Sequence, residues 1–445
     1  MLRRISNSTI LTVLLFATAL GASAQSGEYL SFTPYSIFGV GDIVQQGSPY
    51  NRGMGGVGIA TRNVRYLNNL NPASVTARDS LSVLMDFSVT NNNTIYRQNI
   101  DGNRYSSANN NTNIGSIGFS TPVFRNCAVM IGVTPYAAQG YSYLSKETDP
   151  TVIARNGNIS YYDYGQGSMY KVYLGGGYAI TKSLSVGAEA DYIFGNYNKY
   201  FTEVFGTTGY NTAQDSYEMK LNAFTGKFGL QYEQRLGKEW TLGVGATYSL
   251  KSNFHGTVAY SHLSVGTAET ITVSSKVDTL GNNAGGVQMA PELGIGISLS
   301  YLDKFRAEFN YIRSDWTKSG MDAADGFSNS GSRTPFMAGV RESYRAGVEY
   351  IPNMYDLRRR WKRYTYRAGA YYNNEYYKVA GNEINSFGIT LGATIPVYQW
   401  YNGLTFSVDL GQRGRLEDTL IRERYVKVSV GVNLHDLWFL RYHYN

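Results

Sequence analysis

Three glycines near the N-terminus have the spacing of a dinucleotide-binding loop. Gly53, Gly55 and Gly58 fit G-x-G-x-x-G, and Asp79 follows about twenty residues later, where the acidic residue of that fingerprint would stand. The fingerprint requires a buried strand directly before the glycines. Residues 45–52 are polar instead and contain both glycine and proline. The sequence therefore predicts a packing segment, in which glycine allows close contact and positive φ, and no nucleotide site.

Two other groups of residues could carry chemistry. Glu189 and Asp191 are two residues apart, so on a strand they would share one face as paired catalytic carboxylates do, yet no nucleophile or serine motif accompanies them. His255 and His262 are seven residues apart, which is not a standard metal-ligand spacing. We therefore expect no catalytic residue, no metal site and no cofactor.

The first 24 residues have the features of a secretory signal peptide. Arg3 and Arg4 precede an apolar stretch over residues 10–20, and Ala22-Ser23-Ala24 forms a small-residue cleavage site. The apolar stretch is too short to span a bilayer comfortably, which disfavours an uncleaved anchor. The sequence predicts an exported protein whose mature chain begins at Gln25.

Composition excludes several classes of protein. The chain has 49 Gly, 39 Tyr and 10 Pro among 445 residues, and after the signal peptide it lacks the run of about 20 apolar residues that a transmembrane helix needs. Its single cysteine, Cys127, cannot form an internal disulfide. The net charge is +7, but the basic residues are scattered apart from a cluster at residues 358–363, so we expect no nucleic-acid partner.

From residue 81 onward, apolar and polar residues alternate with a period of two. Residues 184–194, 241–248, 293–300, 404–410 and 426–434 all follow this pattern, and each is about as long as a transmembrane β-strand. Polar segments at 92–112, 147–165, 200–215, 262–287 and 318–334 are expected as long loops, and they alternate with tight turns. The sequence predicts an all-β fold, an antiparallel outer-membrane barrel of about 14 strands with periplasmic turns and termini.

Charged residues occur in phase on the polar faces of these strands. Inside a barrel, opposite charges on neighbouring strands can pair and stabilise the wall, or they can line a selective pore. Tyrosines between residues 364 and 377 are expected in the aromatic girdles at the membrane surfaces. The lumen-facing candidates are Glu189, Asp191, Glu233, Arg306, Glu308, Arg367 and Asp409, together with Lys227, Arg345, Glu349 and Lys427.

The segment before the first strand carries a resemblance to a known family. A glycine-rich stretch, then Asn71-Pro72-Ala73, then a barrel of about 14 strands resembles the FadL-type outer-membrane transporters of hydrophobic compounds, which include the PorV-type proteins. Residues 170–191 are similar to a characteristic hairpin of that family. The resemblance implies a plug, or hatch, over residues 25–80 inside a barrel over residues 81–445. It assigns the hatch motif to Gly53, Gly55, Gly56, Gly58, Asn71, Pro72 and Ala73.

Two functions follow as expectations from this resemblance. The first is passive transport of hydrophobic small molecules, such as long-chain fatty acids or aromatic compounds, through a hatch-occluded lumen and a lateral gap at a kinked strand. The alternative is a non-transporting, PorV-like partner of an outer-membrane secretion or assembly complex. The polar segments 92–112 and 262–287 lack the apolar clusters of a lipid-catching surface, and the charged lumen disfavours a hydrophobic conduit. The expected location is the outer membrane of a Gram-negative bacterium, in contact with membrane lipid and lipopolysaccharide.

Overall fold

A computed structural model describes residues 31–77, 82–100, 102–207, 209–264, 269–281, 283, 285–328, 336–398, 402–417 and 420–437. The expected signal peptide at residues 1–24 lies outside these ranges. Within them, no helix is long and apolar enough to cross a membrane.

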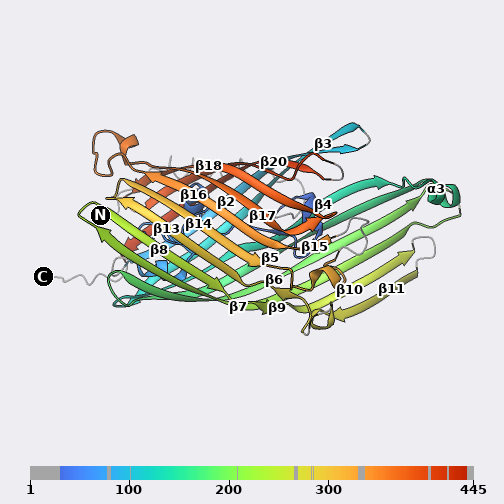
Figure 1. Ribbon diagram of the computed structural model, residues 1–445, viewed down its shortest axis with the longest axis horizontal. Coiled ribbons are helices and arrows are strands. Elements are labelled where there is room, and N and C mark those ends of the chain that lie inside the picture. The colour runs from blue at the N-terminus through green and yellow to red at the C-terminus, as the bar shows by residue number, and fades with distance from the viewer. Residues whose placement is uncertain are drawn as a thin grey trace.

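Fourteen antiparallel strands form a closed ring, in which each strand pairs with its neighbours in the sequence and β20 pairs with β2 (Figure 1). The predicted all-β fold and strand number are confirmed. The strands are β2 (Ser82–Ile100), β3 (Asn103–Phe124), β4 (Cys127–Lys146), β5 (Ile159–Ala179), β6 (Leu184–Phe205), β7 (Ala213–Leu236), β8 (Trp240–Ser249), β13 (Glu292–Tyr301), β14 (Phe305–Asp315), β16 (Val340–Tyr350), β17 (Thr365–Val379), β18 (Asn382–Tyr398), β19 (Asn402–Arg413) and β20 (Arg422–Leu437).

The two-residue periodicity separates a lipid-facing surface from a polar lumen. On β13, Leu293, Ile295 and Ile297 are 42%, 47% and 50% exposed, whereas Ser298 is buried. An apolar band of this kind is stable only against lipid, because in water it would form one continuous exposed patch. The alternation therefore accounts for both the barrel and its lipid-facing surface, as in other outer-membrane β-barrel folds.

Several segments expected as loops are strand instead. The β2–β3 hairpin remains paired as far as Ile100 and Asn103, so most of residues 92–112 belong to the sheet. Asparagine side chains support it, since Asn91 Nδ2 donates to Asn110 Oδ1 at 3.1 Å and to Thr112 Oγ1 at 2.7 Å. β6 and β7 likewise reach into residues 200–215. The prediction was wrong here because polar residues that alternate above the membrane still form a sheet.

The expected tyrosine girdle is partly wrong. Tyr366 and Tyr372 face outward and are 37% and 43% exposed, but Tyr371, Tyr376 and Tyr377 are almost fully buried. Tyr376 and Tyr377 are adjacent, and both are buried because the register between β17 and β18 shifts between Asn374 and Lys378. Such a bulge breaks the strict alternation of the two faces.

Apart from η5, which lies in the turn between β16 and β17, the remaining elements lie inside the ring or toward the end opposite the short turns (Figure 1). Strands β10 and β11 extend the sheet beyond β7, and the connections that follow β11 and β14 contribute to the buried core at this end. The short strands are β1 (Asp42–Ile43), β9 (Ser252–Asn253), β10 (His255–Ser264), β11 (Glu269–Lys276), β12 (Gln288–Met289) and β15 (Phe336–Ala338). The helices are η1 (Pro34–Ile37), α2 (Pro49–Arg52), η2 (Pro72–Thr76), α3 (Pro150–Asn156), η3 (Val277–Thr279), η4 (Met321–Ala323) and η5 (Arg360–Arg363).

Candidate functional site: the filled lumen

A packed apolar core occupies the outer half of the lumen. Residues 35–40 lie in it and belong to the N-terminal segment before the barrel, for which we keep the name hatch; side chains from the upper strands and the loops surround them. Phe38 stacks on Phe336 with ring centroids 5.3 Å apart. Lys199 is fully buried, and its Nζ donates to the carbonyl oxygens of Ile37 and Gly326 at 2.8 and 2.6 Å. This core, the outer cap, joins hatch, wall and loop where a ligand from outside would have to enter.

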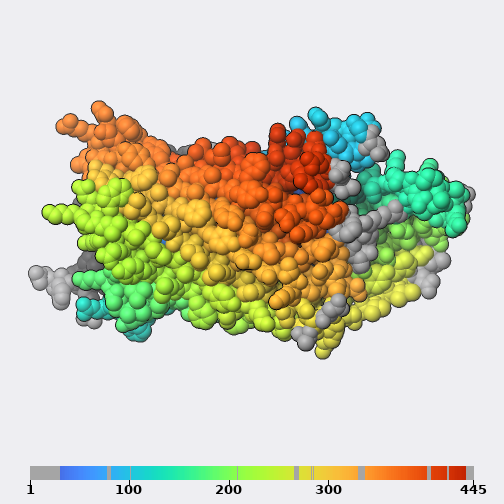
Figure 2. All heavy atoms as spheres, viewed as in Figure 1, coloured from blue at the N-terminus to red at the C-terminus, as the bar shows by residue number. Residues whose placement is uncertain are grey.

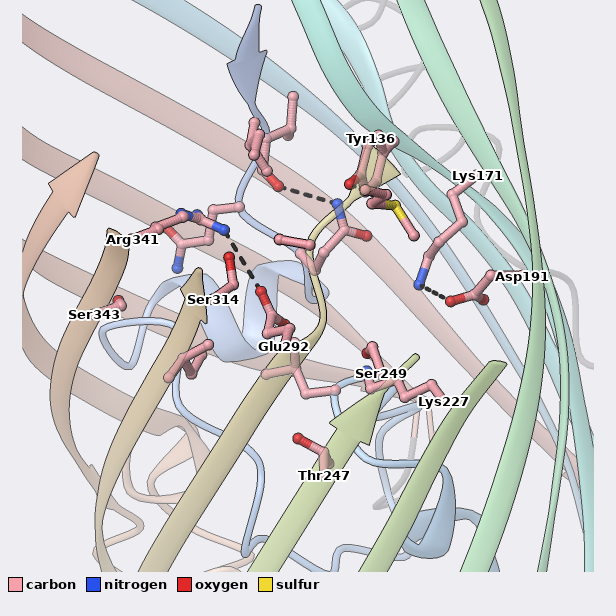
Figure 3. Close-up of a pocket in the computed structure, with 18 of the residues that line it drawn as sticks. Tyr136, Lys171, Asp191, Lys227, Thr247, Ser249, Glu292, Ser314, Arg341 and Ser343 are labelled. Carbon is pink, nitrogen blue, oxygen red and sulfur yellow. Dashed lines mark hydrogen bonds and ion pairs between the residues drawn. The ribbon is translucent and has the colours of Figure 1, made fainter. Parts of the chain in front are cut away.

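Below the outer cap, hatch residues 42–46 line two small cavities that contain both charged and apolar side chains. Each has a volume of about 110 Å³, which is well below the roughly 300 Å³ at which pockets for drug-sized ligands begin. Lys171, Asp191, Lys227, Glu292 and Arg341 line the first cavity and point into it from the surrounding strands (Figure 3). The second is lined by Arg52, Glu375, Asp409, Arg413 and Lys427, among others. Apolar side chains such as Ile43, Ile193 and Met289 also line the first cavity, so buried charges and apolar groups share this part of the lumen.

Glu189 and Asp191, the two carboxylates weighed as a catalytic pair, contact a lysine that the sequence analysis missed. Lys171 Nζ lies 3.1 Å from Glu189 Oε1 and 3.4 Å from Asp191 Oδ2, and all three side chains are buried. Counting back from the turn at residues 181–183 pairs Tyr173 with Asp191 and leaves Lys171 diagonal to it, so hairpin register could have identified this lysine. The two salt bridges of Lys171 therefore link β5 to β6 inside the lumen.

A second ionic group joins the hatch to the opposite wall. Arg367 Nε donates to Glu349 at 2.9 Å, and its guanidinium lies 4.2 Å from the ring centroid of Tyr50 in the hatch. Arg306 is 3.9 Å from Glu349 and donates to the Tyr50 hydroxyl at 3.2 Å. Cations over an aromatic face gain electrostatic attraction when they are desolvated. These lumen-facing candidates therefore hold the hatch in place.

Three more candidates also contact the hatch or its surroundings. Glu308 accepts from the Ala60 amide at 2.9 Å and from the Thr61 hydroxyl. Glu233 lies 3.7 Å from Arg62. Asp409 accepts from the Tyr371 hydroxyl at 2.8 Å and lines the second cavity. Of the additional candidates, Lys227 donates to the Asn69 carbonyl at 3.3 Å, Arg345 donates to Ser343 at 2.7 Å, and Lys427 lies 4.5 Å from the Tyr425 ring.

Arg413 is a central residue of the lumen that sequence reasoning also missed. It contacts Asp42 of the hatch at 2.9 Å, Glu375 at 3.4 Å and Glu423 at 3.8 Å. The apolar pattern of this strand was followed only to residue 410, whereas β19 continues to Arg413 in phase with Asp409. Extending the alternation by two more polar positions, Gly411 and Arg413, would have identified this arginine.

The hatch motif is held by matching glycines in the wall. A Cβ on Gly229 would lie 2.1 Å from Asn71 Oδ1, and one on Gly187 would lie 2.4 Å from the Ala73 nitrogen. Asn71 Oδ1 accepts from the Ala73 amide at 3.0 Å, and its Nδ2 donates to the Ile59 carbonyl at 2.8 Å. Asn71-Pro72-Ala73 therefore begins η2 and fits against β6 and β7.

The glycine-rich stretch is also closely packed. Gly55 and Gly56 have φ angles of +74° and +79°, which glycine adopts without strain. Gly53 and Gly58 have ordinary φ angles, but Gly392 approaches Gly53 and Asn51 approaches Gly58 where a side chain would stand.

Asn71→Asp is expected to destabilise the fold by about 2 kcal/mol, because a carboxylate cannot donate to the buried Ile59 carbonyl. The free energy of unfolding in lipid bilayers, measured by denaturant titration, would show this loss. Asn103→Asp at the exposed tip of the β2–β3 hairpin should change it by less than about 0.5 kcal/mol. Equal effects from the two substitutions would contradict a structural role for the motif.

One seam in the wall is closed by the hatch instead of by a neighbouring strand. β3 pairs with β4 only between Ile117 and Phe124. Above that point the free edge of β4 pairs with β1, which places Asp42 opposite Ala138 and Ile43 opposite Ala137. The Thr33 amide extends this contact by donating to the Gly140 carbonyl at 2.8 Å.

Within the described residues, no group of three or more His, Cys, Asp or Glu side chains has the geometry of a metal site.

The family model of BamG matches residues 1–445, the whole chain. The chain belongs to the BamG family. None of the curated protein sequences matches this BamG-family chain.

Solved structures with the same fold include outer-membrane channels. The Pseudomonas putida toluene transporter TodX is 15% identical, with a TM-score of 0.60 over 89% of this chain and 100% of TodX. The CymD monoaromatic hydrocarbon channel is also 15% identical, with a TM-score of 0.55 over 88% and 97%. A Pseudomonas aeruginosa FadL homologue is 10% identical, with a TM-score of 0.55 over 88% and 99%. At these identities the BamG-family chain shares the FadL-type fold, which confirms the resemblance at that level.

Proposed function

We propose that this chain is a non-transporting component of an outer-membrane protein-assembly complex. The whole-chain match to the BamG family carries the proposal, because the family name refers to barrel-assembly machinery. The lumen supports it, since the outer cap packs hatch residues 35–40 against the wall, and the two cavities below it are small and contain buried charges. In this role the lumen charges and the hatch make the barrel rigid, and its loops, turns and rim are the surfaces available to partner proteins.

The test combines an interaction measurement with a folding measurement. The full-length chain carrying a tag should co-purify with barrel-assembly proteins in mild detergent, and its depletion should reduce the heat-modifiable, folded fraction of other outer-membrane barrels. An unrelated barrel carrying the same tag serves as the control. Normal folding of other barrels after depletion, with no assembly protein recovered, would contradict the proposal.

Passive transport of hydrophobic molecules is the second candidate, and the seam between β3 and β4 favours it. If the hatch moved away from β4, an opening would form in the wall beside an external apolar groove lined by Phe87, Ile117 and Val133. The solved transporters that share the fold make this route worth testing.

We expect liposomes that contain the protein to take up fatty acid or toluene no faster than protein-free liposomes. The outer cap must unpack before a ligand can enter, and this is the physical reason for the expectation. TodX in the same liposomes is the positive control. Saturable uptake above the lipid background would make transport the better assignment.

A further inference from the structure

The turn between β16 and β17 is the longest connection at the short-turn end of the barrel, and it carries the basic cluster that the lumen does not use. Residues 351–364 contain five cationic side chains and one carboxylate, a net charge of +4. The other turns at this end are much shorter and carry at most two charged residues each. This concentration of charge in one turn calls for its own explanation.

The turn has a defined conformation. The Asn353 amide donates to the Lys362 carbonyl at 2.8 Å across its base. Asp356 accepts from the backbone amides of Arg359 and Arg358 at 2.7 and 2.9 Å, and these hydrogen bonds, that from Arg359 first, hold the pKa of its carboxyl below the usual value. The ionised Asp356 lies 3.5 Å from Lys362 and so uses its charge within the turn.

The side chains of three arginines in the turn are exposed on the outside of the protein. Arg358, Arg359 and Arg360 are exposed, and none of them forms an ion pair with another described residue. Between and beside them, Leu357 is 84% exposed and Trp361 is 52% exposed. A surface that presents guanidinium groups next to large apolar side chains is typical of a segment lying at a membrane interface.

A hydrogen bond joins this turn to the outward face of β17. Tyr366 faces outward on β17, and its hydroxyl donates to the Trp361 carbonyl at 3.1 Å. Tyr350, which pairs with Tyr366 from β16, is also outward and 51% exposed, so the two rings lie at the level of an aromatic girdle. The turn is thus held at the girdle, and Figure 2 shows it in orange, standing out sideways from the end of the barrel.

We propose that the turn over residues 351–364 binds anionic phospholipid headgroups of the periplasmic leaflet through Arg358, Arg359 and Arg360. Charge complementarity selects this occupant, because a guanidinium pairs with phosphate in a bidentate manner and three of them lie at headgroup height. Leu357 and Trp361 would enter the interface beside them. The short-turn end is the periplasmic end in outer-membrane barrels, so these arginines face the inner leaflet.

Native mass spectrometry of the full-length, detergent-purified protein with added phosphatidylglycerol or phosphatidylcholine tests this site. Wild-type protein should prefer phosphatidylglycerol by at least about tenfold, since each cation near an anionic surface contributes roughly fivefold in affinity. R358Q/R359Q/R360Q should bind the two lipids almost equally. The matched control R125Q/K182Q/K238Q removes the same charge from three other turns of the same end and should keep the preference.

The remaining outcomes overturn the proposal. Equal loss of preference in both triple variants would mean that diffuse charge is responsible, and an unchanged preference in R358Q/R359Q/R360Q would mean that the turn is not the site. Loss of an acidic partner protein from that variant, with lipid binding unchanged, would identify the turn as a protein-docking surface instead. Heat-modifiable migration on a gel verifies that all variants are folded. These results are independent of whether the assembly function holds.

Discussion

Lys171→Met is expected to lower the free energy of unfolding by about 3 to 5 kcal/mol, because it removes the cation that directly contacts two buried carboxylates. Glu189 and Asp191 are both within 3.4 Å of the Lys171 ammonium, and the three side chains are at most 7% exposed. Removal of the cation also leaves like charges close together on neighbouring positions of β6. Denaturant titration of the protein folded in lipid bilayers, followed by tryptophan fluorescence, measures the loss.

A lysine in an exposed pair provides the control for this substitution. Lys220 lies 2.8 Å from Glu218, but the two side chains are 67% and 53% exposed. Lys220→Met should cost no more than about 0.5 kcal/mol, because water solvates the carboxylate that remains. Equal losses from the two lysines would mean that the lumen is solvated as well as the outer surface, and the support role of the charged lumen would then be wrong.

Gly369→Ala is the second large effect, with an expected loss of about 3 kcal/mol from overpacking. A Cβ on Gly369 would lie 2.3 Å from the Gly55 nitrogen and 2.5 Å from the Met54 carbonyl carbon. Both are backbone atoms, so the hatch itself would have to move. The added methyl group should therefore loosen the hatch as well as lower overall stability.

Limited trypsin digestion separates these two effects. Arg52 and Arg62 are shielded in the hatch, so wild-type protein should resist cleavage there, whereas Gly369→Ala should be cut. Gly176→Ala is the matched control, since the nearest atom to its Cβ would be 3.5 Å away. Resistance of Gly369→Ala equal to that of Gly176→Ala would show that the wall glycines are not fitted to the hatch.

The strands could be predicted from sequence because one residue in two meets lipid. Leu293, Ile295 and Ile297 have no alternative to the outer face, and tight turns at residues 181–183 and 302–304 then set the register. Above the membrane this constraint is lost. The asparagine ladder between β2 and β3 therefore resembles a loop in sequence although it is paired strand.

The lumen could be predicted only in part, because its partners come from distant strands. Glu189 and Asp191 stand out on the polar face of β6, but Lys171 becomes their counter-ion only through the β5–β6 register. Likewise, the glycines at 53–58 indicate confinement, whereas their fit depends on Gly369 and Gly392, which lie hundreds of residues away in the chain. Tyr376 and Tyr377 were misplaced because a single bulge reverses the expected direction of a side chain.

The seam between β3 and β4 also has a consequence for the order in which the molecule folds. Most of the barrel can pair strand by strand, but the upper edge of β4 finds its backbone partner in the N-terminal segment. A chain that closed its ring before this segment entered would keep an unpaired strand edge, the feature that promotes intermolecular β-pairing. Insertion of the N-terminal segment therefore completes the backbone pairing of the wall at this seam, in addition to the β20–β2 pairing that closes the ring.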